Sequence, residues 1–188
     1  MKKITLAERP MGAPKEKNFN LEETKVPEPK NSEVLVAIHY MSLDPYMRGR
    51  MDDAKSYAKP IEVGDTMEGG AVGRVIASKS KNFYVGDYVC GQMGWATHGC
   101  VKDTLLRRLD PKVAPITTAL GILGMPGFTG WYGLTKLGFP KKGETLVVGA
   151  ATGPVGSMVG QIAKSRGLRT IGVAGSDKKC TLAKKKFK

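Results

Sequence analysis

The chain has 188 residues, and its 41% hydrophobic and 25% charged content excludes low-complexity disorder and a collagen-like repeat. Its 30 Lys and Arg against 17 Asp and Glu give a formal net charge of +13. From Lys164 onward nine basic residues stand against one acidic residue, so this segment carries +8 and the preceding 163 residues only +5. The length fits one large domain or two small ones, each able to bury a hydrophobic core.

Nothing in the sequence predicts export or insertion into a membrane. The basic start, 1–3, is followed by Glu8 and Arg9 instead of the apolar region of a signal peptide. The uncharged stretches 113–135 and 145–163 are interrupted by glycines and prolines, which favours buried core over a membrane-spanning helix. The three cysteines have no paired spacing, which favours a reducing compartment, and we expect a cytoplasmic protein.

The first half of the chain predicts short strands joined by turns. Apolar, β-branched runs occupy 34–38 and 71–76, and a further strand is expected over 84–90. Glycine–aspartate turn signals at 64–65 and 86–87 punctuate these strands. Because the strands are short and no long helical period separates them, we expect a small antiparallel barrel.

From about residue 116 the pattern changes to helices alternating with strands. Residues 116–137 predict a helical connection that is broken around 125–127, where glycine follows proline. Beyond it the order is strand, helix and strand, over 145–149, 155–166 and 169–174. This order, with a glycine-rich turn before the helix, is typical of the first βαβ unit of a parallel sheet. The predicted fold class is therefore β followed by α/β.

The turn between the first of these strands and its helix carries the strongest local motif. Residues 151–156 (ATGPVG) match the dinucleotide-binding fingerprint, with alanine in place of its first glycine. Small residues let the backbone approach a pyrophosphate, and the first helical turn offers free N–H groups and a partial positive charge. The candidate nucleotide-binding residues are Gly153, Pro154, Val155 and Gly156. The alternative is a tight turn without a ligand.

The end of the second strand indicates which nucleotide is bound. Sites for NAD usually place Asp or Glu about 20 residues after the glycine turn, where it holds the ribose 2′-hydroxyl. Gly175 and Ser176 stand at the end of this strand, directly after 169–174, and Lys178 and Lys179 follow the first acidic residue, Asp177. A hydroxyl group and lysines suit the 2′-phosphate of NADP(H), which we expect as the cofactor. The alternative is that the lysines belong to a solvated helix start.

Three motifs lie in order along the chain: 42–48 (SLDPYMR), 124–129 (GMPGFT) and 153–161 (GPVGSMVGQ). Together they resemble the zinc-independent medium-chain dehydrogenase/reductase family of prostaglandin reductases, alkenal double-bond reductases and bacterial NADP-dependent oxidoreductases. The resemblance implies a GroES-like catalytic barrel domain over 1–118 and a partial Rossmann domain that binds NADP(H) over 119–188. It also implies an oxidoreductase that uses NADPH to reduce the carbon–carbon double bond of small α,β-unsaturated aldehydes and ketones.

The resemblance implies a role for each candidate site residue. The pyrophosphate would lie on the four residues of the glycine turn. The 2′-phosphate would face Gly175, Ser176 and Lys179, and the nicotinamide ring would lie near Met125 and Thr129. These assignments come from matching motif positions and not from the spacing of the residues.

Tyr46 is the one side chain for which the resemblance implies a part in catalysis, at the mouth of the active site. Hydride transfer to the β-carbon of an enone places negative charge on the carbonyl oxygen, and a hydroxyl group there would stabilise it before the α-carbon is protonated. The alternative is a tyrosine packed in a Pro-Tyr turn. Some relatives carry a second tyrosine where this chain has Gly70, a departure that leaves the size and polarity of the substrate pocket open.

No metal site is expected. Zinc-dependent members of the wider family carry a cysteine near the position of Ser42 and a histidine at that of Met67, so these ligands are missing here. His98 and Cys100 could supply two ligands, but the remaining candidates, such as His39, lack ligand spacing. The sequence also lacks the Gly-x-Ser-x-Gly motif of hydrolases.

The predicted Rossmann domain reaches only its second strand, whereas the complete fold has about six. We therefore expect the chain to be a truncated part of a longer reductase, and we expect the complete reductase to be a homodimer. Residues 184–188 would begin the helix after the second strand. Two alternatives stay open. One is a catalytically inactive, truncated nucleotide-binding fragment. The other is binding of nucleic acid by the basic C-terminal segment. We disfavour it because no recognition motif accompanies the lysines. Neither nucleic acid nor a membrane is an expected partner.

Overall fold

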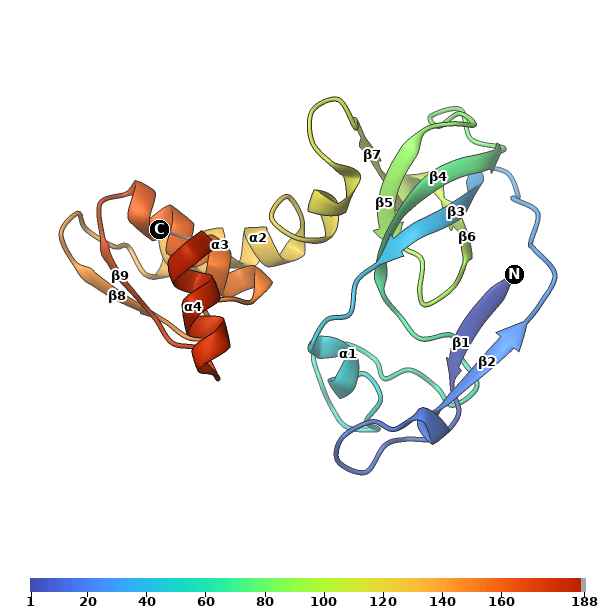
Figure 1. The fold of residues 1–188 in the computed structure, drawn as a ribbon. Helices are drawn as coiled ribbons and strands as arrows, with labels where there is room; N and C mark the ends of the chain where they lie inside the picture. Colours follow the sequence, from blue (N-terminus) through green and yellow to red (C-terminus); the bar gives the residue numbers. More distant parts are fainter. Residues whose placement is uncertain (187–188) are drawn as a thin grey trace. The chain divides into compact units, whose positions relative to one another are not determined.

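The structure is a computed structural model that describes residues 1–186, and the chain divides into two compact units between Thr117 and Thr118. The boundary predicted from the sequence lies one residue later. The first unit consists mainly of β-strands, and the second combines helices with a two-stranded sheet (Figure 1). Across the described residues, no helix combines the length and the apolar character that crossing a membrane requires.

A five-stranded antiparallel sheet dominates the first unit and confirms the antiparallel strands predicted there (Figure 1). Its strands lie in the order β6 (His98–Lys102), β3 (Glu33–Met41), β4 (Gly70–Ser78), β5 (Tyr88–Gln92) and β7 (Arg107–Leu109). The strand predicted over 84–90 begins only at Tyr88. The preceding residues form a turn, in which the Tyr84 backbone N–H donates to Asp87 at 2.8 Å and Gly86 has a φ of 102°.

Two further strands form a separate antiparallel pair, β1 (Lys2–Leu6) with β2 (Phe19–Glu23). Isolated bridges join β1 to the rest of the unit at Ala96 and Thr66. Three short helical turns complete the unit: η1 (Glu16–Asn18), α1 (Tyr46–Gly49) and η2 (Asp103–Leu105). Polar residues dilute the apolar pattern in β1, β2, β6 and β7, and the sequence analysis did not predict these strands.

The core of the first unit has two clusters. The larger one lies on the sheet and is formed by inward-facing residues of β3, β4 and β5, among them Val34, Val36, Val75 and Val89. Val75 and Val89 alternate with more exposed neighbours, the period of two that a strand imposes, whereas Leu35, between Val34 and Val36, is buried as well. The second cluster contains Leu6, Met51, Ile61 and Met67, with Trp95 packed against it. It anchors the segment around α1 to β1.

Gly73 lies where β4 crosses β3 so closely that no side chain fits. A Cβ atom there would lie 2.2 Å from the Ala37 carbonyl oxygen and 2.7 Å from Val36 Cγ1. Because the nearest obstacle is a backbone atom, a side chain at this position would force the two strands apart. We therefore expect Gly73→Ala to lower the free energy of unfolding by about 3 kcal/mol, the upper end of the usual overpacking cost. Urea unfolding measures this loss. Gly49→Ala is the control, because nothing lies within 4 Å of its Cβ position; equal losses in both variants would refute the packing argument.

The second unit has the predicted order of strand, helix and strand (Figure 1). Its elements are η3 (Ile116–Leu120), which contains the boundary, α2 (Met125–Tyr132), η4 (Gly133–Leu137), β8 (Thr145–Val148), α3 (Pro154–Ser165), β9 (Arg169–Gly172) and α4 (Asp177–Lys186). β8 and β9 are parallel, with Val148 opposite Gly172. The helix α3 ends, as predicted, before Gly167, whose φ of 76° favours glycine. Leu134, Ala163 and Leu168 form the buried core.

Two details of the second unit correct the sequence-based predictions. Pro126 and Gly127 do not break a helix; they belong to the first turn of α2, where a proline costs no hydrogen bond, and the interruption lies over 121–124. The last helix begins at Asp177 and not at Lys184. Ser176 caps it, and the lysines at 184–186 form its last turn, where their charge complements the helix dipole. Phe187 and Lys188, which were included in that prediction, lie outside the described residues.

Candidate functional site

The turn between β8 and α3 presents backbone donors at the start of the helix. Gly153 is the N-cap residue with an extended conformation, and Pro154 occupies the first turn. The N–H groups of Val155 and Gly156 fall in the first turn of the helix, where no intrahelical carbonyl can reach them. The backbone of Ala150, just before, has a φ of 48°, a left-handed conformation that costs a non-glycine residue of order 1–3 kcal/mol. Such a strained turn at a helix N-terminus is a geometry suited to binding a phosphate.

Gly156 permits the close contact between α3 and this turn. A Cβ atom at that position would lie 2.4 Å from the Ala150 carbonyl oxygen and 2.9 Å from that of Gly149. Gly156 is buried, whereas Pro154 and Val155 are exposed. Gly149 has nothing within 4 Å of its Cβ position. The turn is therefore closed on the helix side and open on the side from which an extended ligand would approach.

The predicted 2′-phosphate residues follow β9 at the same edge of the sheet as the glycine turn. β8 and β9 are adjacent and parallel, so the segments after their carboxyl ends lie side by side, and the Ala151 N–H donates to the Val173 carbonyl oxygen at 3.0 Å. Gly175, Ser176 and Lys179 are all exposed there. The Ser176 Oγ atom accepts a hydrogen bond from the Lys179 backbone N–H at 3.3 Å, which fixes the start of α4. This arrangement provides a hydroxyl group, a helix N-terminus and a cationic side chain.

Met125 and Thr129 share one exposed face of α2, one turn apart. The Thr129 hydroxyl group donates to the Met125 carbonyl oxygen at 2.8 Å, so its oxygen remains available as an acceptor. α2 packs on α3 through Gly130, whose Cβ position lies 3.1 Å from both the Val155 carbonyl oxygen and Val159 Cγ2. The structure thus brings α2 against the helix that follows the glycine turn.

Tyr46 belongs to the first unit, where it begins α1 and is half-buried. Its side chain is hydrogen-bonded to Gln92, at the end of β5. Burial raises the pKa of Tyr46 above its ordinary value, and the carboxylates of Asp44 and Glu68 raise it further, against the opposing effects of Gln92 and the Arg50 charge. The hydroxyl group consequently keeps its proton at neutral pH. A neutral, half-buried hydroxyl group can donate a hydrogen bond to an oxygen that gains negative charge.

The residues that act on Tyr46 were not among the predicted site residues. Arg50, which caps the C-terminal end of α1, forms an ion pair with Glu68, and their closest atoms, Nη2 and Oε2, are 2.7 Å apart. Only the spacing of four residues between Tyr46 and Arg50 could have indicated that they share a face. Glu68 and Gln92 come from segments more than 20 residues away from Tyr46, and only the folded sheet brings them near it.

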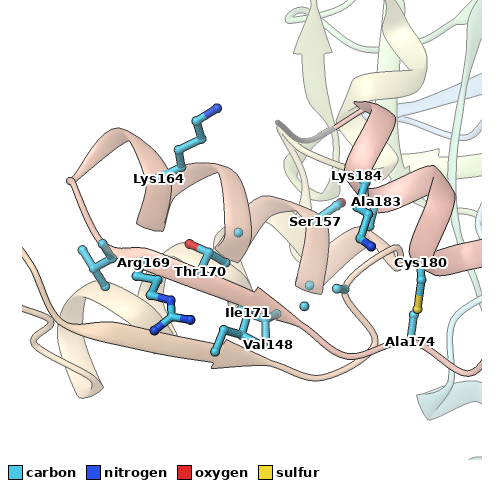
Figure 2. Close-up of a pocket in the computed structure, with 15 residues that line it drawn as sticks. Val148, Ser157, Lys164, Arg169, Thr170, Ile171, Ala174, Cys180, Ala183 and Lys184 are labelled. Atoms are coloured by element: carbon cyan, nitrogen blue, oxygen red, sulfur yellow. The ribbon is translucent and has the colours of Figure 1, made fainter.

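A groove of about 780 Å³ lies between α3, β9 and α4 (Figure 2). Val148 and Ile171 contribute apolar surface, and Lys164, Arg169 and Lys184 contribute positive charge. Figure 2 shows Lys164 and Arg169 toward one end and Cys180 with Ala174 toward the other. Among the predicted cofactor residues, only Gly156 lines the groove. The candidate site is therefore the edge of the sheet beside the glycine turn and not this groove.

No three of the side chains His, Cys, Asp and Glu gather in the described part of the chain in a way that could hold a metal ion. Ser42 donates a hydrogen bond to the Gly70 carbonyl oxygen at 3.2 Å. Cys100 lies near the carboxylate of Glu33, with a sulfur–oxygen distance of 3.5 Å, and His39 makes an edge contact with the ring of Tyr88. Ser42, Cys100 and His39 thus each contact a different residue of the first unit.

The same chain is similar to known oxidoreductases over almost all its length. Residues 2–109 match the family model described as the N-terminal domain of oxidoreductase. The NADPH-dependent curcumin reductase of Escherichia coli is 50% identical over 93% of this chain and 51% of its own length, and the NADP⁺-dependent 2-alkenal reductase of Nicotiana tabacum is 40% identical over 99% and 56%. The crystal structure of CurA from Vibrio vulnificus in complex with NADPH superposes with a TM-score of 0.94, at 47% identity, over 100% of this chain and 56% of that one. The chain spans about half the length of the curated relatives that it matches.

Proposed function

The chain belongs to the medium-chain dehydrogenase/reductase family, and on this premise we propose that it is part of an NADPH-dependent reductase of carbon–carbon double bonds in α,β-unsaturated aldehydes and ketones. The names of the relatives, a curcumin reductase and a 2-alkenal reductase, support this substrate class. The proposal assigns catalysis to a GroES-like domain over 1–118 and cofactor binding to a Rossmann domain over 119–188.

The observation that carries the proposal is the edge of the β8–β9 sheet, where the glycine turn and the start of α4 lie side by side. The donor set fits NADP(H): free N–H groups of Val155 and Gly156 for the pyrophosphate, and Ser176 with Lys179 for the 2′-phosphate. Gly175 has nothing within 4 Å of its Cβ position, so the backbone there is open to a ligand. Met125 and Thr129 would contact the nicotinamide ring.

When bound, NADPH supplies the hydride that reduces the β-carbon of the substrate. The task of the chain is to hold the reactants in position and to stabilise the charge that develops on the carbonyl oxygen. Tyr46 would donate a hydrogen bond to that oxygen, because its raised pKa keeps the hydroxyl group protonated. Protonation of the α-carbon completes the reduction. The chemistry requires no zinc ion, in keeping with Ser42 and Met67 at the positions where zinc-dependent members carry ligands.

An assay of NADPH consumption tests the proposal. We expect oxidation of NADPH that depends on an enal or enone and yields the saturated carbonyl compound. No consumption across enals, enones and quinones would exclude the reductase. Retained NADPH binding without turnover by this chain would favour the alternative, a truncated nucleotide-binding fragment that is catalytically inactive. We further propose that the complete enzyme is a cytoplasmic homodimer, which its mass in solution would test.

Tyr46→Phe removes only the hydroxyl group. If this group stabilises the developing oxyanion, kcat should fall by about 10²-fold, the loss typical of one such donor, with the Kd for NADPH unchanged. Steady-state kinetics and NADPH titration separate the two effects. Tyr57→Phe is the matched control, because Tyr57 is 87% exposed in the same unit. Unchanged turnover of Tyr46→Phe on an enal would remove this residue from the mechanism and leave the structural alternative.

A further inference from the structure

Arg50 and Glu68 form a two-point ion pair one helical turn away from Tyr46. Arg50 Nε donates to Glu68 Oε2 at 2.9 Å, and Nη2 donates to Oε1 at 2.9 Å and to Oε2 at 2.7 Å. The Arg50 side chain is only 15% exposed, and that of Glu68 is 42% exposed. The planar guanidinium group thus fixes the direction of both side chains as well as their separation.

This ion pair is poorly arranged for stability alone. The third guanidinium nitrogen, Arg50 Nη1, is fully enclosed and has no hydrogen-bond partner among the described residues. Withdrawing the Arg50 guanidinium group from water is costly, and an enclosed donor without a partner adds to that cost. The arrangement therefore calls for an explanation other than the stability of the first unit.

The contacts around the pair form a closed ring that contains Tyr46. Arg50 follows Tyr46 by four residues, and its backbone N–H donates to the Tyr46 carbonyl oxygen at 3.2 Å, so the two side chains share a face of α1. Glu68 leads through the buried Gly69 into Gly70, the first residue of β4. Gly70 lies opposite Gln92 in the sheet, and Gln92 is hydrogen-bonded to the side chain of Tyr46, which closes the ring.

α1 needs such an anchor because it is too short to hold itself. It has four residues, and a single helical turn is not stable in isolation. Met47 holds one side of it, buried with its methyl group 3.1 Å from the Cβ position of Gly69. On another side Arg48 donates to the carbonyl oxygens of Pro10 and Gly12 and pairs with Asp52. Arg50 adds a polar anchor to the segment leading into β4, through its ion pair with Glu68.

We infer that Arg50 and Glu68 are a positioning pair for Tyr46: their ion pair ties the end of α1 to the segment that leads into β4 and so fixes where the Tyr46 hydroxyl group lies. The inference rests on the proposed function of Tyr46 as the hydrogen-bond donor to the substrate oxygen. It assigns no contact with the substrate to either residue.

The charged and polar groups that act on the Tyr46 hydroxyl come from four places in the chain. Asp44 precedes α1, Arg50 follows it, Glu68 precedes β4 and Gln92 ends β5. Burial raises the pKa of Tyr46 most, the two carboxylates raise it further, and Gln92 and Arg50 lower it. The two members of the positioning pair thus act on the same hydroxyl group with opposite sign.

This opposition gives a test that a purely structural role would not pass. In the full chain, without cofactor or substrate, Glu68→Gln should lower the pKa of Tyr46, Arg50→Gln should raise it, and the double variant should return it toward the wild-type value. Titration by NMR, with tyrosine labelled at the oxygen-bearing ring carbon, measures the pKa, and Tyr46→Phe assigns the signal. Arg48→Gln and Asp52→Asn are matched controls: they break an ion pair on the same segment that does not act on Tyr46.

Shifts of the same direction in both single variants, or shifts as large in the controls, would overturn the inference. If charge removal unfolds α1, as the backbone NMR shifts of Tyr46–Gly49 would reveal, Arg50→Lys decides. Lysine keeps the positive charge and loses the planar guanidinium group that binds both carboxylate oxygens. The Tyr46 pKa should then stay close to the wild-type value, and a shift like that expected of Arg50→Gln would refute the inference.

In the reductase assay Glu68→Gln should lower kcat about tenfold or more without changing the Kd for NADPH. Because the titration needs no turnover, a failure of the proposed reductase activity would be distinguishable from a failure of the positioning pair.

Discussion

Gly156→Ala is expected to abolish measurable NADPH binding while the same substitution one turn further along the helix is tolerated. The added methyl group would lie 2.4 Å from the Ala150 carbonyl oxygen and 2.9 Å from the Ala150 carbonyl carbon. Both obstacles are backbone atoms of the turn, so the N-terminus of α3 must move away from it. Because the helix N–H groups act on a phosphate only over hydrogen-bond distances, a shift of this size should weaken binding at least 100-fold.

The matched control for this variant is Gly160→Ala. Its Cβ atom would meet only Thr170 Cγ2, at the ordinary contact distance of 3.8 Å. Alanine is the better helix former, so this variant should raise the free energy of unfolding by about 0.5–1 kcal/mol, whereas Gly156→Ala should lower it by about 1–3 kcal/mol. Calorimetric titration with NADPH and urea unfolding measure the two effects. Wild-type affinity in Gly156→Ala would show that the turn does not hold the pyrophosphate.

The cofactor turn could be predicted because its signal is local. Strand, small residues and helix follow one another within a few positions, and the structure has α3 over 154–165 where 155–166 was expected. The left-handed conformation of Ala150 could not be predicted, since alanine avoids it without a constraint from the surrounding fold. The start of α4 has a local signal as well, because a serine directly before an aspartate is a helix start signal.

The surroundings of Tyr46 could not be predicted for the opposite reason. Tyr46 itself stood out through a motif, but Glu68 and Gln92 reach it only because β4 pairs with β5 in a register that sets Gly70 opposite Gln92. Register depends on the whole buried face of a sheet and on bulges, and β3 pairs with β4 through two register shifts. A sequence motif can therefore name a candidate catalytic side chain without naming the charges that set its pKa.

Lys179→Ala should distinguish a specific 2′-phosphate site from a general attraction of anions to the second unit. From Thr118 onward the sequence has 12 basic residues and two acidic ones, so an unspecific positive field is a serious alternative. A charge-assisted hydrogen bond contributes about 1.5–3 kcal/mol, so its loss should weaken NADPH binding roughly 10–100-fold. NADH, which lacks the phosphate, should bind the variant and the wild type equally well.

Lys186→Ala removes the same charge from the other end of α4. Seven residues of helix separate the two lysines by about 10 Å, about one Debye length at 0.1 M salt. A specific site therefore predicts a large loss of NADPH affinity in Lys179→Ala and almost none in Lys186→Ala, with fluorescence titration of both nucleotides as the measurement. A general field predicts small, equal losses in both variants that vanish at high salt. Ser176 lies at the N-terminus of α4, where the helix dipole also favours an anion, so the specific site is the outcome that the geometry supports.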